Sequence, residues 1–293
     1  MSTVNFRLPQ GSIRKSEFLL FQQYVAQSCG IHVPPEKAYL FETRLSKMML
    51  DVGIDSFGAF YDYIVAQPDP SMRQKIVNAI TTNETQWFRD ETPWRVLEEV
   101  LLPKLVDRIA SGRKAQIRIW SAAASTGQEI YSTVMCVDTY LRQNRVKGVA
   151  LSDFDFFATD ISNRVLDVAK KGRYDRISIM RGLSDDYRGR YFAQNSSSWD
   201  IDPRIRDAVR FAHFNLQNAY QVWGKFDVIF CRYVLIYFSD ALKQEVIMKM
   251  RDALAAGGTL FTGNYALYGL FSNDFDANHY GNLTYYAKKE ACV

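Results

Sequence analysis

The sequence predicts a Rossmann-like α/β domain with a small inserted β-subdomain, preceded by an all-α N-terminal domain. Three observations support this prediction. The 293 residues are enough for about two domains. Apolar residues recur at helical spacing through the first 80 or so residues, without a convincing strand. Further along the chain, short apolar runs of strand character alternate with helical segments, which is typical of a parallel sheet covered on both faces.

Four short helices are expected in the first domain, and glycine and proline mark their ends. Gly30 follows the first helix, and Pro34 with Pro35 opens the second. The expected ranges are 15–29, 36–50 and 56–66, with a fourth helix that begins near Ser71. We therefore assign residues 1–90 to the helical domain and its linker, and residues 91–293 to the α/β domain.

In the α/β domain the expected elements follow one another in regular alternation. Helices are expected at 91–110, 127–142, 162–171 and 241–255, and strands at 116–120, 156–159, 209–214, 226–231 and 259–262. Pro103 should kink or break the first of these helices. The connection between residues 171 and 209 is longer than usual, and its part around 188–210 is predicted to form the inserted β-subdomain.

Composition excludes several classes of function. The net charge of +4 is too small to favour nucleic acid as a partner without a concentrated basic patch. The four cysteines form no CxxC pair and the three histidines are scattered, so no metal site and no disulfide framework is expected. There is no apolar run of about 20 residues and no N-terminal signal pattern, so we expect a soluble, cytoplasmic protein without membrane insertion.

The loop after the first strand has the features of a small-molecule site. Ser121 to Gly127 carries small side chains and opens a helix, so a ligand could approach the backbone and the free N–H groups there. The loop is neither GxGxxG nor a P-loop, which disfavours a pyrophosphate. Glu129 could accept a hydrogen bond from a ligand ammonium group, or could simply favour the helix dipole.

Three further strand ends carry candidate residues. Asp160 could bind ribose hydroxyls or cap the next helix. Asn215 could meet an adenine edge and Leu216 its face, although asparagine is also a common turn residue. Arg232 follows an apolar strand, where a charge is costly unless it is paired or functional. A ribose carboxylate without phosphate-binding glycines favours a nucleoside lacking a pyrophosphate, and S-adenosylmethionine is the main candidate.

These four loops, together with Thr82 to Asp90, closely resemble the signature of the chemotaxis receptor methyltransferases, the CheR family. The likeness extends from about Ile31 to about Gly263 in several ordered motifs. The resemblance implies a helical N-terminal domain and an S-adenosylmethionine-dependent methyltransferase domain. It also implies methylation of glutamate side chains on the cytoplasmic helices of chemoreceptors, with S-adenosylhomocysteine as the product.

The resemblance also implies roles for individual residues. The residues expected at the cofactor are Asn83, Thr85, Arg89, Glu129, Asp160, Asn215, Leu216, Arg232 and Tyr233. Among them Glu129 would contact the methionine end, Asp160 the ribose, and Asn215 and Leu216 the adenosine. Arg89 and Tyr237 are expected at the reacting centre. No general base is needed, because a glutamate carboxylate is already ionised at neutral pH.

Receptor docking is expected to use charge. Lys37, Arg44 and Lys47 fall within about 80° on a helical wheel, so they could steer an acidic receptor helix, or could be an ordinary solvated face. The inserted hairpin lacks a glycine-rich loop and is slightly short, so we expect docking that does not depend on a receptor's C-terminal pentapeptide. We expect a monomer.

Two departures from the family pattern keep alternatives open. The family usually has asparagine where this chain has Tyr233, and Gly-His-Ser-Glu where it has Gly263 to Ala266. A catalytically silent S-adenosylmethionine-binding regulator is therefore an alternative to the enzyme. A nicotinamide-dependent oxidoreductase is disfavoured by the missing glycines.

Overall fold

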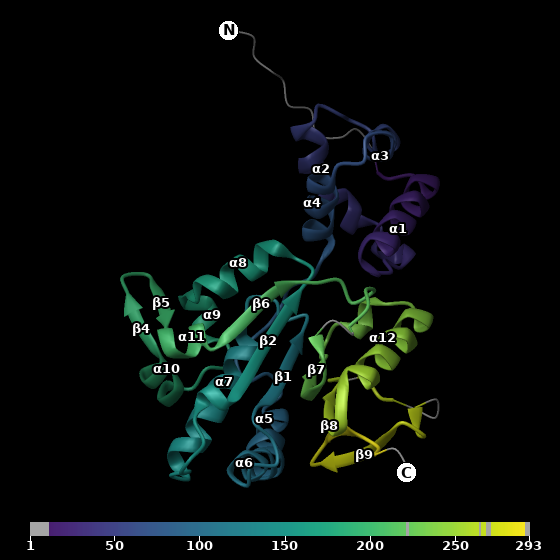
Figure 1. Cartoon of the computed structure of the whole chain (residues 1–293). Helices are drawn as coiled ribbons and strands as arrows, with labels where there is room; N and C mark the ends of the chain where they lie inside the picture. The colour runs from purple at the N-terminus through teal and green to yellow at the C-terminus, as the bar shows by residue number, and fades with distance from the viewer. Residues whose placement is uncertain (1–11, 221–222, 264, 268–270, 291–293) are drawn as a thin grey trace. The chain divides into compact units, whose positions relative to one another are not determined.

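The computed structural model describes residues 12–220, 223–263, 265–267 and 271–290. The chain divides into two compact units (Figure 1). Unit 1 ends at Thr82 and also includes Tyr237–Leu242, while unit 2 comprises Asn83–Ile236 and the chain from Lys243 onward. The family departure at Asn264 lies outside the described residues.

Unit 1 is the expected helical domain. Its helices are α1 (Lys15–Cys29), α2 (Tyr39–Asp51), α3 (Phe57–Ala66) and α4 (Pro70–Ile80), with a 3-10 turn, η1, at Pro35–Lys37. Gly30 ends α1 in the left-handed conformation at φ 79°. Phe21, Phe41 and Phe60 are fully buried at its centre. The expected helix at 36–50 is two elements, because Ala38 separates η1 from α2.

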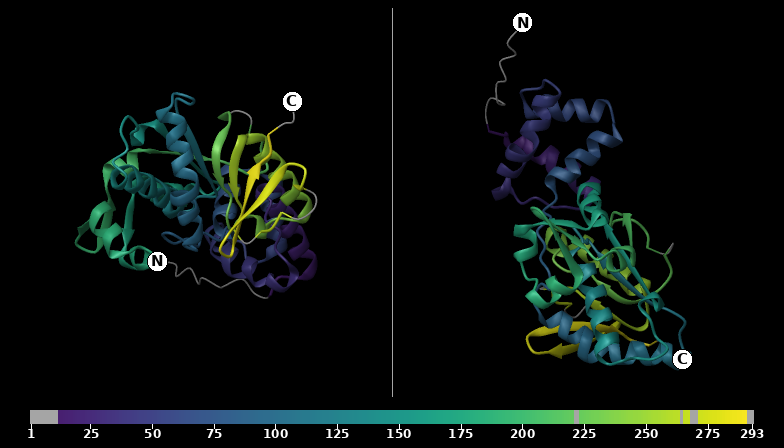
Figure 2. Two further views of the ribbon diagram at one scale, coloured as in Figure 1. Left: turned by 90° about the horizontal axis from the view of Figure 1, so that it is seen from below. Right: turned by 90° about the vertical axis from the view of Figure 1, so that its left-hand side faces the viewer.

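Unit 2 is built on a seven-stranded sheet in the order β6-β2-β1-β7-β8-β10-β9. Its strands are β1 (Ile117–Ala122), β2 (Phe154–Asp160), β6 (Val209–His213), β7 (Phe226–Phe230), β8 (Leu254–Phe261), β9 (Phe275–Tyr280) and β10 (Leu283–Lys288). The first five are parallel, but β10 pairs antiparallel with both β8 and β9. The parallel sheet that the sequence predicts is thus continued at one edge by β10 and β9, which add antiparallel pairing there and are drawn in yellow in Figure 2.

The main helices of unit 2 are α5 (Thr92–Val96), α6 (Leu102–Ala110), α7 (Gln128–Gln143), α8 (Asn163–Lys171) and α12 (Asp240–Ala253), of which α12 begins in the segment counted with unit 1. A π-helical turn, η2 (Leu97–Leu101), joins α5 to α6 just before Pro103. The Leu102 N–H reaches back to the Leu97 carbonyl across this wide turn, and Pro103 has no N–H to place in the ladder. The expected break therefore takes the form of a local widening of a continuous helical run.

Successive residues of β1 serve the two faces of the sheet. Ile117 and Ile119 pack in a core with α5 to α7. Trp120 points into an aromatic cluster that includes Tyr220 and Phe226, with ring centroids 5.3 Å away in both cases. Both faces of the sheet are thus covered, which leaves the carboxyl ends of the parallel strands for ligands.

The inserted β-subdomain is a three-stranded antiparallel sheet. It comprises β3 (Arg173–Asp175), β4 (Phe192–Asn195) and β5 (Ser198–Ile201), in the order β3-β5-β4, with the short helices α9 (Arg176–Met180), α10 (Asp185–Tyr191) and α11 (Pro203–Asp207). Its first strand, β3, lies before the range expected from the sequence. Val209, at the end of that range, already begins β6 of the large sheet.

Candidate active site

The loop between β1 and α7 has an unusual backbone. Ala123, Ser125 and Gly127 all have positive φ angles, at 66°, 52° and 95°. Two of these residues carry a Cβ, for which the left-handed conformation costs about 1–2 kcal/mol each. A Cβ at Gly127 would lie 2.9 Å from the Tyr131 ring, so helix packing alone explains this glycine. The loop is held in a strained shape by its surroundings.

Asp160 holds this loop in place. Its Oδ2 accepts a hydrogen bond from the Ser125 N–H at 2.8 Å, and its Oδ1 accepts one from the Ser162 N–H at 2.9 Å. Burial raises the pKa of this carboxyl, against the effect of the backbone hydrogen bonds. Ser162, and not Asp160, is the N-cap residue of α8. A carboxylate has about four acceptor sites, more than these backbone hydrogen bonds use, so acceptor capacity remains for a ligand.

Glu129 and Arg232 form the second half of the site. Glu129 accepts from the Ser121 hydroxyl at 2.8 Å and from the Arg232 guanidinium at 2.9 Å. The Arg232 side chain is 1% exposed, and it also donates to the Asp90 carboxylate at 2.6 Å and to the Arg89 carbonyl at 2.8 Å. The charge at this strand end is therefore paired, and Arg232 connects α7 to the segment before α5.

That segment, Asn83–Asp90, is the linker of the sequence motif and belongs to unit 2. The Asn83 carbonyl accepts a hydrogen bond from the Ser125 hydroxyl at 2.8 Å, which joins the linker to the β1–α7 loop. The Arg89 guanidinium carbon lies 3.4 Å from the centroid of the Tyr233 ring. Thr85 is half-buried in the same segment. The linker thus contacts two of the predicted strand-end loops.

Asn215 and Leu216 follow β6, the neighbour of β2. The Phe214 N–H donates to the Asp160 carbonyl at 2.9 Å, so this segment begins beside the predicted ribose carboxylate. The Asn215 side chain accepts from the Gln217 N–H at 3.0 Å, which is the turn geometry considered as its alternative role. Leu216 is 7% exposed.

The remaining predicted residues belong to unit 1. The Tyr237 carbonyl accepts from the His32 N–H at 2.8 Å. Arg44 donates to the Ile80 carbonyl at 2.6 Å and so caps the end of α4. Lys37 lies in η1 rather than on α2 with Lys47, so the helical-wheel argument for a continuous basic stripe is wrong. Lys37 and Lys47 are both exposed.

Sequence reasoning missed three residues that shape the site. Ser121 and Ser125 bind Glu129 and the linker through their hydroxyls, and Asp90 pairs with Arg232. Serine in a loop gives no distinctive signal. Asp90 could have been found, because a buried arginine requires a carboxylate and the linker motif offers one.

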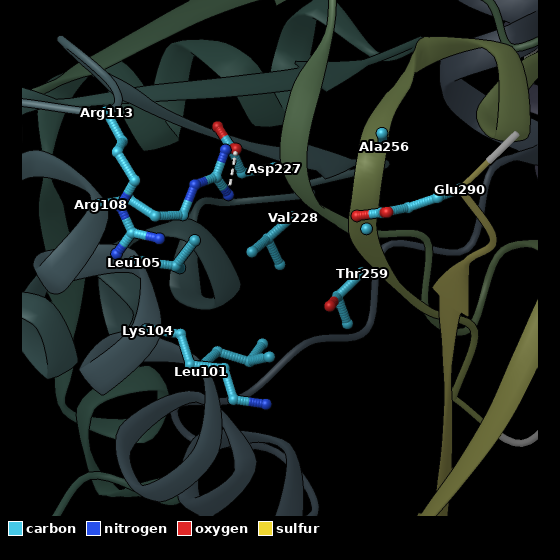
Figure 3. A pocket seen from close by; sticks show the side chains of 11 residues that line it. Leu101, Lys104, Leu105, Arg108, Arg113, Asp227, Val228, Ala256, Thr259 and Glu290 are labelled. Carbon is cyan, nitrogen blue, oxygen red and sulfur yellow. Dashed lines mark ion pairs between the residues drawn. The ribbon is translucent and has the colours of Figure 1, made fainter. Parts of the chain in front are cut away.

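A cavity of about 400 Å³ lies at the opposite, amino end of β7 (Figure 3). The buried Asp227 is paired there with Arg108 at 3.1 Å and with Lys114. Within the described ranges, no group of His, Cys, Asp or Glu side chains could hold a metal ion, and no helix is long and apolar enough to cross a membrane. This cavity adds no residue to the site at the carboxyl ends of the strands.

Comparison with known families covers both units. Residues 16–81 match the model described as CheR methyltransferase, all-alpha domain, and residues 83–273 match CheR methyltransferase, SAM binding domain. The second match identifies S-adenosylmethionine as the cofactor.

Whole-length relatives agree with the family match. The chain is 41% identical to chemotaxis protein methyltransferase Cher2 of Pseudomonas putida, over 87% of this chain and 91% of that protein. It is also 41% identical to chemotaxis protein methyltransferase 1 of Pseudomonas aeruginosa, over 86% of this chain and 90% of that protein. A chemotaxis protein methyltransferase of Vibrio anguillarum is 38% identical, over 86% and 89%.

Proposed function

Since the chain belongs to the CheR family of S-adenosylmethionine-dependent chemotaxis methyltransferases, we propose that it methylates glutamate side chains on the cytoplasmic helices of chemoreceptors. The product would be a glutamate methyl ester, which serves adaptation in chemotaxis signalling. One observation carries this proposal. Hydrogen bonds connect Asp160, Glu129 and the linker that contains Arg89 at the carboxyl ends of adjacent strands.

The residues at these strand ends fit the cofactor. Asp160 keeps acceptor capacity for ribose hydroxyls beside its backbone hydrogen bonds. Glu129 likewise keeps acceptor sites for an ammonium group beside its bonds to Ser121 and Arg232. Asn215 and Leu216 would meet the adenosine. S-adenosylmethionine, when bound, supplies a methyl group activated by a sulfonium.

The chain's own contribution to the reaction is orientation. The substrate carboxylate is ionised at neutral pH, so no residue has to remove a proton. Arg89 would hold that carboxylate by charge and hydrogen bonding, with Tyr237 as the second residue proposed for the reacting centre. Holding two reactants in line near 3 Å can contribute about 7–11 kcal/mol to lowering a barrier. Site rigidity, rather than acid–base chemistry, would therefore set the rate.

Receptor recognition would rest on the exposed Lys37 and Lys47, because Arg44 is committed to capping α4. Docking would not need a C-terminal pentapeptide on the receptor. The short connection between β4 and β5 supports this second point, since Asn195 pairs directly with Ser198 and only two residues lie between them. Such a tight turn offers little surface for a peptide.

The test is to incubate the purified protein with labelled S-adenosylmethionine and receptor cytoplasmic fragments. We expect base-labile label in a receptor fragment, with and without the fragment's last five residues. Arg89→Ala should bind S-adenosylhomocysteine yet transfer no label. Confirmed cofactor binding by the wild-type protein without label in any receptor would overturn the enzyme proposal.

One observation favours a second candidate, a silent cofactor-binding regulator. Arg89 is stacked on Tyr233, a residue that replaces the family's usual asparagine, so its guanidinium could be withheld from a substrate. The labelling experiment separates the two candidates. A regulator would bind S-adenosylhomocysteine and receptor fragments but would form no methyl ester.

A further inference from the structure

We propose that Tyr233 is a positioning residue that fixes the Arg89 guanidinium for the substrate carboxylate. This inference rests on the proposed function. The Arg89 guanidinium carbon lies 3.4 Å from the ring centroid of Tyr233, which is close contact for a cation over an aromatic face. The guanidinium also donates a hydrogen bond to the Glu84 carbonyl at 3.5 Å, the long limit for such a bond. The Tyr233 ring is thus the main contact that holds the Arg89 guanidinium in place.

The Tyr233 ring is itself held from two sides. Its backbone has a φ of 59°, a left-handed conformation that a bulky side chain rarely adopts. Its hydroxyl donates a hydrogen bond to the Asp90 carboxylate. The same carboxylate oxygen accepts from Arg232 at 2.6 Å. Asp90 therefore joins the tyrosine ring to a guanidinium that is almost fully buried.

Arg232 extends the support into the sheet and α7. It lies two residues after the end of β7, and its Nη1 donates to Glu129 at 2.9 Å. A second bond from Arg232, to the Arg89 carbonyl at 2.8 Å, fixes the backbone from which the Arg89 side chain grows. One network, formed by Arg232, Asp90 and Tyr233, therefore contacts both the backbone and the guanidinium of Arg89. Asparagine at position 233 would keep the Arg232 bonds but offer no ring to the tip.

Three variants of Tyr233 distinguish the contribution of its aromatic ring from those of its hydroxyl group and its size. Tyr233→Phe keeps the aromatic face, Tyr233→Leu keeps an apolar side chain of moderate size, and Tyr233→Asn carries the residue usual in the family. A cation–π contact contributes about 0.5–2 kcal/mol, which corresponds to roughly two- to thirtyfold in rate. We expect kcat of the Leu variant to fall by about tenfold relative to the Phe variant. The dissociation constants of the Leu and Phe variants for S-adenosylhomocysteine should agree within about twofold, since both keep an apolar side chain at position 233 and differ in how they orient Arg89.

A readout independent of activity tests the stack itself. The measurement is the NMR chemical shift of the Arg89 side-chain Nε–H, whose signal is assigned by its loss in Arg89→Lys. A ring-current shift should be present in the wild-type protein and in Tyr233→Phe, and absent in Tyr233→Leu and Tyr233→Asn. If no receptor is methylated at all, the proposed function fails, and this shift alone decides the present inference. Equal kcat in the Phe and Leu variants, a parallel fall in cofactor affinity, or an absent ring-current shift would each overturn it.

Discussion

Asp160 lies in an environment that differs from that of an ordinary surface carboxyl, because its side chain is buried. Burial raises its pKa in the folded protein above the unfolded value of about 3.9. A raised pKa means that this group's contribution to the free energy of unfolding is fully present below the unfolded pKa. The contribution is lost as the pH rises through the folded pKa. At neutral pH the charged carboxylate therefore costs stability, which is consistent with the ribose-binding role proposed for it.

Asp160→Asn should therefore gain stability relative to wild type as the pH rises from about 4 toward 7. Urea unfolding at successive pH values measures the difference. At pH 7 the variant should also bind S-adenosylhomocysteine at least about tenfold more weakly, because one of the carboxylate oxygens proposed to accept from the ribose is replaced by an NH₂ group. Asp155→Asn is the matched control, since Asp155 lies in the same strand but is paired with Arg118 and Arg210. A stability difference that does not change with pH would contradict the assignment.

At the scale of elements, the linker is anchored to the inserted β-subdomain by Trp87. This side chain is fully buried, and its ring lies 4.9 Å from Tyr174 and 5.1 Å from Phe192. Its backbone N–H donates to the Arg181 carbonyl at 3.0 Å. The next residue, Gly182, has a φ of 88°, and a Cβ there would lie 2.1 Å from the Trp87 carbonyl oxygen. The backbones approach so closely that only glycine fits.

Gly182→Ala should consequently destabilise unit 2 by several kcal/mol, about as much as truncating a core aromatic residue, 3–5 kcal/mol. Gly189→Ala provides the control. Gly189 lies in α10 with nothing within 4 Å of its added Cβ, so alanine should be neutral or stabilise by up to about 1 kcal/mol. Thermal unfolding of both variants gives the comparison. Similar melting temperatures for the two would show that the linker is not anchored here.

The elements also show what sequence patterns can and cannot determine. Parallel strands and amphipathic helices were predictable because their apolar periodicity is local. The strands β9 and β10 were missed because β9 is largely polar and exposed, reading Phe-Asp-Ala-Asn-His-Tyr, and its partner becomes apparent only once the sheet exists. At the site, Asp160 and Glu129 follow from their place after strands. The pairing of Asp90 with Arg232, 142 residues apart, is a tertiary contact: the sequence indicates that Arg232 needs a carboxylate, but no local pattern tells which one it meets.

For the whole molecule, the division into units does not follow the order of the chain. Tyr237–Leu242 lies far along the sequence yet belongs to unit 1, where Phe238 forms a bridge with Ile31. The His32 N–H donates to the Tyr237 carbonyl at 2.8 Å in the same place. Close packing supports the bridge, since a Cβ on Gly30 would lie 2.5 Å from the Leu242 Cδ2 methyl group. Unit 1 is therefore completed only after most of unit 2 has been synthesised.

His32→Pro tests this organisation in the full-length protein. Proline removes the N–H that binds Tyr237, so the free energy of unfolding should fall by about 0.5–1.5 kcal/mol, and by more if the unpaired carbonyl stays buried. His32→Ala removes only an exposed side chain and keeps the N–H, so it should unfold like wild type. Hydrogen exchange should localise the effect: the amides of α1 and of residues 237–242 should lose protection together in the proline variant. Loss confined to one of the two segments would mean that Tyr237–Leu242 is not an integral part of unit 1.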